Sequence, residues 1–271
     1  MSKKILTIQD ISCYGSCSIT VALPILSSLG VETAILPSAV LSTHTSGFEN
    51  FTVLDLTDEM PKIISHWIKE EIKFDAIYTG YIGDVRQFDY ILECKDKLLK
   101  QDGLFIVDPA MADHGKLYPA LSDDIIYGMI KICSKADYII PNITEACFLT
   151  DIPYTTKLSK NYIDGLLEKL IELGAKNVIL TSVLADNKIG ATFYNRKNKI
   201  TILKDIQKKS YHGTGDIFSS VVIGYLLNNN SIEVVLDKAT DFIIDCINAT
   251  KDDPEHNYGV KFEDILNKKI G

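Results

Sequence analysis

The feature of this sequence that most constrains its fold is an alternation of two kinds of segment. Short runs rich in β-branched and aromatic residues recur along the chain, and each ends at a Gly, Pro, Asp or Asn. Segments with helical periodicity separate them, most clearly over residues 163–171, where Gly174 marks a stop. Apolar strands separated by helices are typical of a parallel sheet covered on both faces. The sequence therefore predicts an α/β fold with a mostly parallel central sheet.

The apolar runs also place the individual strands. We expect strands at residues 5–8, 31–36, 76–79, 104–107, 138–140 and 178–180. Residues 190–194 and 199–203 flank the polar tetrad Asn195–Asn198, which predicts a small antiparallel hairpin at the edge of the sheet. Pro24 lacks a backbone donor, so a kink or a late start is expected in the first helix.

Composition limits the classes of partner. The chain has 271 residues, of which 46% are hydrophobic, and this suits one large α/β domain over residues 1–271. Its net charge of −8 disfavours nucleic acid and anionic membrane surfaces as partners. No stretch approaches the ~20 apolar residues of a membrane span, and the first apolar run is too short for an export signal. A cytoplasmic location is therefore predicted.

The six cysteines are scattered and form no C-x-x-C pair, and no histidine cluster lies near them. This spacing argues against a zinc site and against a disulfide framework. We expect free thiols in a reducing compartment.

Polar residues directly follow most of the expected strands. In an open parallel sheet, the carboxyl ends of the strands form the binding edge, so these residues are candidates for one site. In chain order they are Asp10, Gly80-Tyr81, Asp108-Pro109, Asn142 with Glu145, and Thr181-Ser182.

The segment Gly213-Thr214-Gly215-Asp216 carries the strongest chemical signal. Two glycines leave the backbone free to turn its N–H groups inward, and the helix that follows directs its positive end to the same place. Asp216 would repel a phosphate that is merely bound, but it suits the removal of a proton from a hydroxyl that attacks a phosphoryl group. The alternative is an ordinary helix start with Thr214 or Asp216 as its cap.

Other interpretations of the candidate residues remain open. Asn142 with Glu145 is also a capping-box pattern, and an Asp108-Pro109 turn can simply end a strand. His44, in a polar loop, is expected to be solvated. The chain has no P-loop, no G-x-G-x-x-G, no H-E-x-x-H and no G-x-S-x-G motif.

Taken in order, these segments resemble the ribokinase-like superfamily. The glycine segment that ends in Asp216 is specific to the superfamily, while Ser42–Thr45 and Thr79–Tyr81 are similar to its pyridoxal/pyridoxamine kinase branch. The resemblance runs from Ile5 to about Asn248. It implies a three-layer fold and ATP-dependent phosphorylation of the 5′-hydroxymethyl group of pyridoxal, pyridoxamine or pyridoxine.

The resemblance also implies roles at the phosphate end of the site. Asp216 would be the catalytic base, and the N–H groups of Gly213, Thr214 and Gly215 would stabilise the transferring phosphoryl group. Asp108 and Glu145 would organise Mg²⁺, with K⁺ as a further cation. The residues placed beside ATP are Asp108, Asn142, Glu145, Thr181, Ser182 and Gly213–Gly215.

At the ring end, the resemblance places Thr45 and Tyr81 against the pyridine, with Asp10 and Ser12 at its polar edge. Many pyridoxal kinases carry Ser at the position of Asp10. A carboxylate there would favour a protonated ring nitrogen or the amine of pyridoxamine, and Ser12 would partly replace the missing hydroxyl.

Two other functions stay open at this point. One is a hydroxymethylpyrimidine kinase of thiamine salvage, and the other is a non-catalytic binding protein for pyridoxal phosphate. The intact Asp216 argues against the second, because a carrier has no use for a base beside the phosphate. The resemblance further implies a homodimer.

Overall fold

The computed structural model describes residues 2–45, 48–119, 121–205, 211–253, 255–256 and 258–270. Its strands are β1 (Lys4–Ser12), β2 (Glu32–Leu41), β3 (Val53–Asp55), β4 (Phe74–Thr79), β5 (Leu99–Val107), β6 (Ala112–Asp113), β7 (Lys116–Leu117), β8 (Tyr138–Ile139), β9 (Asn177–Ala185), β10 (Lys188–Tyr194) and β11 (Lys199–Asp205). Its helices are α1 (Ile19–Ser28), α2 (Met60–Lys69), α3 (Gln87–Leu98), α4 (Asp124–Cys133), α5 (Ile143–Thr150), α6 (Lys160–Glu172), α7 (Thr214–Leu227), α8 (Ile232–Thr250) and α9 (Glu263–Ile270).

Across the described residues, one nine-stranded sheet runs through the molecule in the order β11-β10-β9-β8-β5-β4-β1-β2-β3. The six strands from β9 to β2 pair in parallel, whereas β10, β11 and β3 pair antiparallel at the two edges. The mostly parallel sheet and the β10–β11 edge hairpin were both predicted, and both are confirmed.

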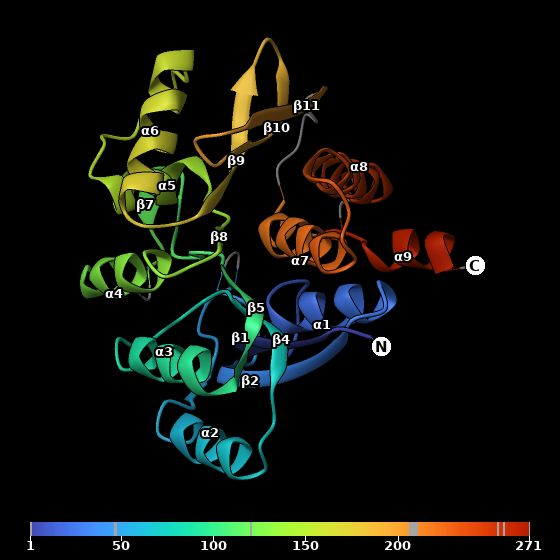
Figure 1. Cartoon of the computed structure of the whole chain (residues 1–271). Coiled ribbons are helices and arrows are strands. Elements are labelled where there is room, and N and C mark those ends of the chain that lie inside the picture. Colours follow the sequence, from blue (N-terminus) through green and yellow to red (C-terminus); the bar gives the residue numbers. More distant parts are fainter. Residues whose placement is uncertain are drawn as a thin grey trace.

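Helices cover both faces of this sheet. Helices α2 to α6 lie on one face, and α1, α7, α8 and α9 lie on the other (Figure 1). Side chains alternate between the two cores along each strand: in β9, Val178 and Leu180 enter the core under α2–α6, and Ile179 enters the opposite core. The three-layer fold is therefore confirmed.

Several strands extend further than their apolar runs indicate, among them β2, which continues to Leu41. β1 continues to Ser12 across a register shift between Gln9 and Ile11, and β9 continues to Ala185. Polar side chains at the carboxyl end of a strand do not stop its backbone from pairing with its neighbour. The expectation that Asp10 follows a strand was wrong in this detail, because Asp10 lies within β1.

The first helix also differs from its prediction. Helix α1 begins at Ile19 and contains Pro24, so of the two alternatives the late start was wrong and the kink stays a prediction. Val21, Ala22, Ile25 and Leu26 are fully buried, and this burial on both sides of Pro24 stabilises the helix despite the missing backbone donor.

Candidate active site

The start of α7 forms the centre of the candidate site. Gly213 precedes the helix with φ 76° and ψ −4°, a left-handed conformation that favours glycine. Thr214, Gly215 and Asp216 are then the first helical residues, so only Gly213 of the expected loop stands outside the helix. Backbone N–H groups in the first turn have no acceptor within a helix. This turn therefore presents donors and the positive end of the helix dipole together.

Asp216 is held at this turn by a residue far away in the sequence. The backbone N–H of Ser18, which precedes α1, donates to Asp216 Oδ2 at 2.9 Å. Burial raises the pKa of Asp216 to about 6, the Ser18 N–H opposes that rise, and nearby Asp10 adds to it. Near pH 7 the carboxyl group is thus largely ionised, yet it is a stronger base than an exposed aspartate.

A second aspartate joins this group from the end of β5. The hydroxyl of Ser219, one helical turn after Asp216, donates to Asp108 Oδ2 at 2.6 Å. Burial, followed by the charge of Asp216, raises the pKa of Asp108 to about 7. The sequence-based interpretation did not assign Ser219 to the site, although its spacing from Asp216 places the two on one helical face.

Asn142 and Glu145 form a complete capping box at the start of α5. Asn142 Oδ1 accepts the N–H of Glu145 at 2.9 Å, and Glu145 Oε2 accepts the N–H of Asn142 at 2.8 Å. Glu145 Oε1 also accepts the N–H of Met111 at 3.2 Å. Burial and then the charge of Asp108 hold the pKa of Glu145 well above its ordinary value. The capping-box interpretation of Asn142 and Glu145 is therefore confirmed. The effect of the Asp108 charge indicates that Glu145 lies close to Asp108.

The predicted ring end also comes together around β1. Asp10 is 3% exposed, and its two oxygens accept the hydroxyls of Ser12 at 2.8 Å and Ser18 at 2.6 Å. Burial, followed by the charge of Asp10, raises the pKa of the Tyr81 phenol to about 12. Asp10 and Ser12 are buried, and the charge of Asp10 acts on both the half-buried Tyr81 and the half-buried Asp216.

The remaining predicted residues are less closely tied to this centre. The backbone N–H of Thr181 donates to the carbonyl of Pro141 at 2.9 Å, so Thr181 lies beside the α5 cap. Ser182 is exposed in a bulge of β9 and has φ 59°. Thr45 is partly buried, and no hydrogen bond joins it to Asp216 among the described residues; Ser46 and Gly47 lie outside them.

His44 is buried rather than solvated, so that expectation was wrong. Its Nε2 lies 3.2 Å from the carbonyl oxygen of Tyr258, and its ring lies 5.0 Å from that of Phe48. The histidine ring also touches the turn at Gly15, where an added Cβ would lie 2.1 Å from it. Tyr258 comes from the far end of the chain, and no local pattern around His44 indicates this contact.

Cys17 lies in the same loop as Ser18. Burial, together with the charges of Asp216 and Asp10, raises the pKa of its thiol to about 12. Such a thiol stays protonated and is a poor nucleophile. All six cysteines are free, as expected.

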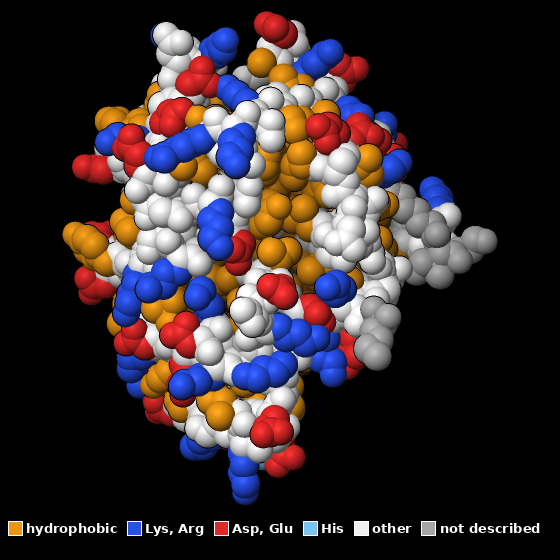
Figure 2. Space-filling view, viewed as in Figure 1, with side chains coloured by type: hydrophobic (Ala, Val, Ile, Leu, Met, Phe, Trp, Pro, Cys, Tyr) orange, Lys and Arg blue, Asp and Glu red, His pale blue; other side chains and the backbone are white. Residues whose placement is uncertain are grey.

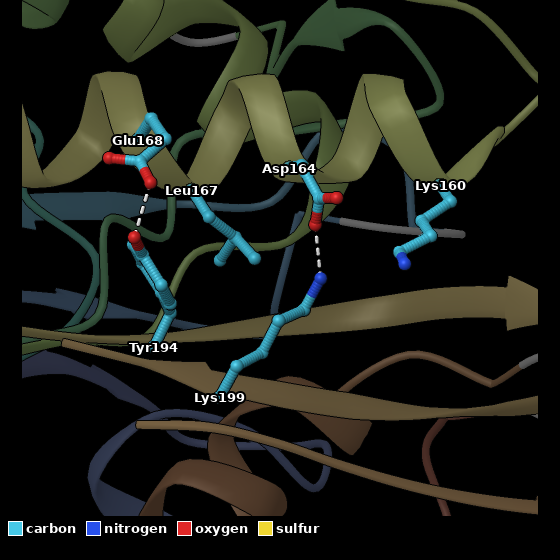
Figure 3. A pocket seen from close by; sticks show the side chains of 6 residues that line it. All are labelled: Lys160, Asp164, Leu167, Glu168, Tyr194 and Lys199. Carbon is cyan, nitrogen blue, oxygen red and sulfur yellow. Dashed lines mark hydrogen bonds and ion pairs between the residues drawn. The ribbon is translucent and has the colours of Figure 1, made fainter. Parts of the chain in front are cut away.

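A surface cavity elsewhere does not belong to this centre. It has a volume of about 320 Å³ and lies between α6 and the β10–β11 hairpin (Figure 3). Lys199 pairs there with Asp164, and Tyr194 donates to Glu168. These paired charges attach the edge hairpin to α6.

Two negative findings concern the described part of the chain. Its His, Cys, Asp and Glu side chains form no cluster of three or more that is ready to hold a metal ion. None of its helices has the length and apolar character that crossing a membrane requires.

Comparison with known proteins shows which family the chain belongs to. A family model described as phosphomethylpyrimidine kinase matches residues 15–261. A protein from Bacteroides thetaiotaomicron assigned as a phosphomethylpyrimidine kinase, in its crystal form with pyridoxal, is 39% identical, with 99% of this chain and 96% of that chain covered and a TM-score of 0.92.

Pyridoxal kinases are also similar over most of their length. The crystal structure of the pyridoxal kinase from Lactobacillus plantarum is 28% identical, covers 98% of this chain and 96% of that chain, and has a TM-score of 0.90. The pyridoxal kinase of Dictyostelium discoideum is 28% identical over 272 residues, which are 92% of this chain and 87% of the relative. The chain therefore belongs to the phosphomethylpyrimidine kinase family, with the ribokinase-like fold of its pyridoxal kinase relatives.

Proposed function

We propose that this chain is an ATP-dependent kinase that phosphorylates the 5′-hydroxymethyl group of a vitamin B6 vitamer. The single observation that carries the proposal is the half-buried carboxylate of Asp216, with its raised pKa, in the same helical turn as the first N–H groups of α7. This pairing unites a proton acceptor with a site for the phosphoryl group. The similarity to pyridoxal kinases and to a relative crystallised with pyridoxal supports the choice of substrate.

In the proposed reaction, Asp216 accepts the proton of the substrate hydroxyl as its oxygen attacks the γ-phosphorus of ATP. The bond from that phosphorus to the bridging oxygen breaks, and ADP leaves. Negative charge on the transferring group is stabilised by the N–H groups of Gly213, Thr214 and Gly215. Because the donors belong to a folded helix turn, they need no rearrangement during the reaction.

The substrate ring would lie toward Asp10, Ser12, Tyr81 and Thr45. Asp10 is buried and Asp216 is half-buried, and the negative charge of Asp10 contributes to the raised pKa of Asp216. A cationic substrate group would offset this charge, which favours a protonated pyridine or the ammonium of pyridoxamine. Thr45 remains a proposed ring contact on the resemblance alone.

ATP would lie on the other side of the α7 start. Figure 2 shows hydrophobic side chains gathered between β9 and α7, with charged side chains around them. Such a surface suits a nucleobase, while Asn142, Thr181 and Ser182 would lie toward the phosphates. The side chain of Asn142 already caps α5 and donates to the carbonyl of Ala112 at 2.8 Å, so we assign it the role of fixing this edge.

Mg²⁺ fits the acidic end of the site. Asp108 and Glu145 are buried and Asp216 is half-buried, and repulsion from a neighbouring carboxylate contributes to the raised pKa values of Asp108 and Glu145. Asp108 would hold the ion directly, and Glu145, whose oxygens accept backbone N–H groups, would act through water. The ion would supply positive charge to the phosphates of ATP. K⁺ remains a further prediction for the same region.

A second candidate activity is phosphorylation of hydroxymethylpyrimidine, favoured by the description of the matching family. A substrate panel decides between the two. Pyridoxal, pyridoxamine, pyridoxine and hydroxymethylpyrimidine are each offered with ATP and Mg²⁺, and ADP release is measured. We expect the highest kcat/KM with a B6 vitamer. Preferential turnover of hydroxymethylpyrimidine would replace the proposal, and no turnover of any of the four would refute it.

We also propose that the protein forms a homodimer through its β3 edge. β3 ends the sheet, and its Val53 and Leu54 side chains are 56% and 62% exposed. An uncovered apolar edge strand is a surface on which a second chain can pair. Light scattering of the wild type and of Leu54→Lys tests this: a dimer that becomes a monomer supports the proposal, and a monomeric wild type contradicts it.

A further inference from the structure

Ser18 has an unusual backbone conformation for a serine. It stands directly before α1 with φ 50° and ψ −135°. This ψ lies outside the small left-handed region open to L-residues, in a part of conformational space that favours glycine. A glycine at this position would relieve the strain, so the side chain of Ser18 must provide an interaction that offsets it.

That interaction is not the usual one for a serine at a helix start. A serine before a helix commonly accepts an N–H from the first turn, but Ser18 makes no side-chain cap bond. Its hydroxyl instead donates to Asp10 Oδ1 at 2.6 Å, and the residue is 6% exposed. Ser18 thus has a strained backbone and makes no capping hydrogen bond, and its hydroxyl forms one short, charge-assisted hydrogen bond to Asp10.

The same residue also holds the catalytic carboxylate. Its backbone N–H donates to Asp216 Oδ2 at 2.9 Å, so the two carboxylates are fixed by the two donors of one residue. Asp10 comes from β1 and Asp216 from α7, so Ser18 links two separate elements of the fold. The distance and direction between these carboxylates therefore depend on the conformation of Ser18.

We propose that Ser18 is a positioning residue that sets the base and the substrate-facing carboxylate relative to each other. Its N–H aims Asp216 at the hydroxyl that is phosphorylated, and its hydroxyl aims Asp10 at the polar edge of the ring. The inference rests on the proposed B6 kinase function. It assigns the hydroxyl of Ser18 to substrate binding and its N–H to catalysis.

Two substitutions distinguish the effect of backbone strain at residue 18 from the effect of losing the Ser18 hydroxyl. Ser18→Gly and Ser18→Ala both keep the N–H that Asp216 uses, and both remove the hydroxyl that Asp10 uses. They differ in strain, which glycine relieves and alanine retains. We expect Ser18→Gly to unfold at a higher urea concentration than Ser18→Ala. We also expect both variants to show a KM for pyridoxamine raised about 10-fold or more, with kcat changed much less.

A double-mutant cycle then tests whether the hydroxyl acts through Asp10. In an Asp10→Ala background, Ser18→Gly should leave the KM for pyridoxamine nearly unchanged, because the hydrogen-bond acceptor of the Ser18 hydroxyl is gone. A KM of Ser18→Gly equal to that of the wild type, or an equal rise in both backgrounds, would overturn the inference while the wild type still turns over B6 vitamers. A wild type that phosphorylates no vitamer removes the proposed function and this inference together.

Discussion

The carbonyl oxygen of Ser16 occupies the space that a side chain on Gly213 would need: a Cβ added to Gly213 would lie 1.9 Å from it. The backbone of the loop before α1 thus packs directly on the start of α7. Glycine is required at residue 213 both for this approach and for its positive φ.

Gly213→Ala should therefore destabilise the protein by about 1–3 kcal/mol and lower kcat, because the first turn of α7 must move. Gly215→Ala is the matched control for stability, since no atom lies within 4 Å of its added Cβ. Urea denaturation of both variants gives the comparison. Equal stability of the two would show that the Ser16 contact does not restrict residue 213.

Asp216→Asn should lower kcat by about 100- to 10,000-fold, the usual contribution of a positioned base. Asparagine keeps the shape and can still accept the Ser18 N–H, but it cannot take a proton. ATP affinity, measured by calorimetry, should stay within a few-fold of the wild type. Retention of near-normal kcat would remove the assignment of Asp216 as base.

The rate should depend on pH through the same group. Asp216 must be ionised to accept a proton, and its pKa is raised to about 6. kcat/KM should therefore rise from pH 5 to pH 7, with its midpoint at about pH 6, and then level off. Initial rates at saturating ATP and Mg²⁺ check this, and a profile that is flat between pH 5 and 7 would contradict it.

Stability should change with pH in the opposite sense. The pKa of Asp108 is about 7 in the folded chain against an ordinary value of 3.8. The folded state therefore binds more protons than the unfolded state between about pH 4 and 7, and the free energy of unfolding decreases as pH rises through that window.

Asp108→Asn removes this charge while an amide oxygen can still accept the Ser219 hydroxyl. In urea without Mg²⁺ or ATP, the variant should exceed the wild type in stability by about 1–3 kcal/mol at pH 8, with little difference near pH 4. Parallel stability curves across this range would mean that Asp108 carries no charge penalty.

The layers of this fold were predictable because they follow from local pattern. Alternating apolar runs and helical periods such as 163–171 indicated the covered parallel sheet, and Gly213–Asp216 indicated the α7 start. The capping box at Asn142 and Glu145 was visible for the same reason, since both partners lie within four residues.

Contacts between distant segments were not predictable. Ser18 meets Asp216 across 198 residues of sequence, and His44 meets Tyr258 across 214. Neither serine nor histidine carries a local signal for such a partner. The strain at Ser18 likewise depends on the packing of three segments, which a single local pattern does not encode.

The two borders of the central sheet have opposite surface chemistry. At β11, Lys199 and Lys204 are engaged by acidic side chains of α6 and α8, so this border is charged and occupied. At β3, Val53 and Leu54 face outward. Of the two borders as far as the structure describes them, β3 alone exposes apolar side chains in this way. If two chains pair through β3 as proposed, each uses up its exposed border, so the assembly would end at a closed two-fold pair and would not extend into a fibre.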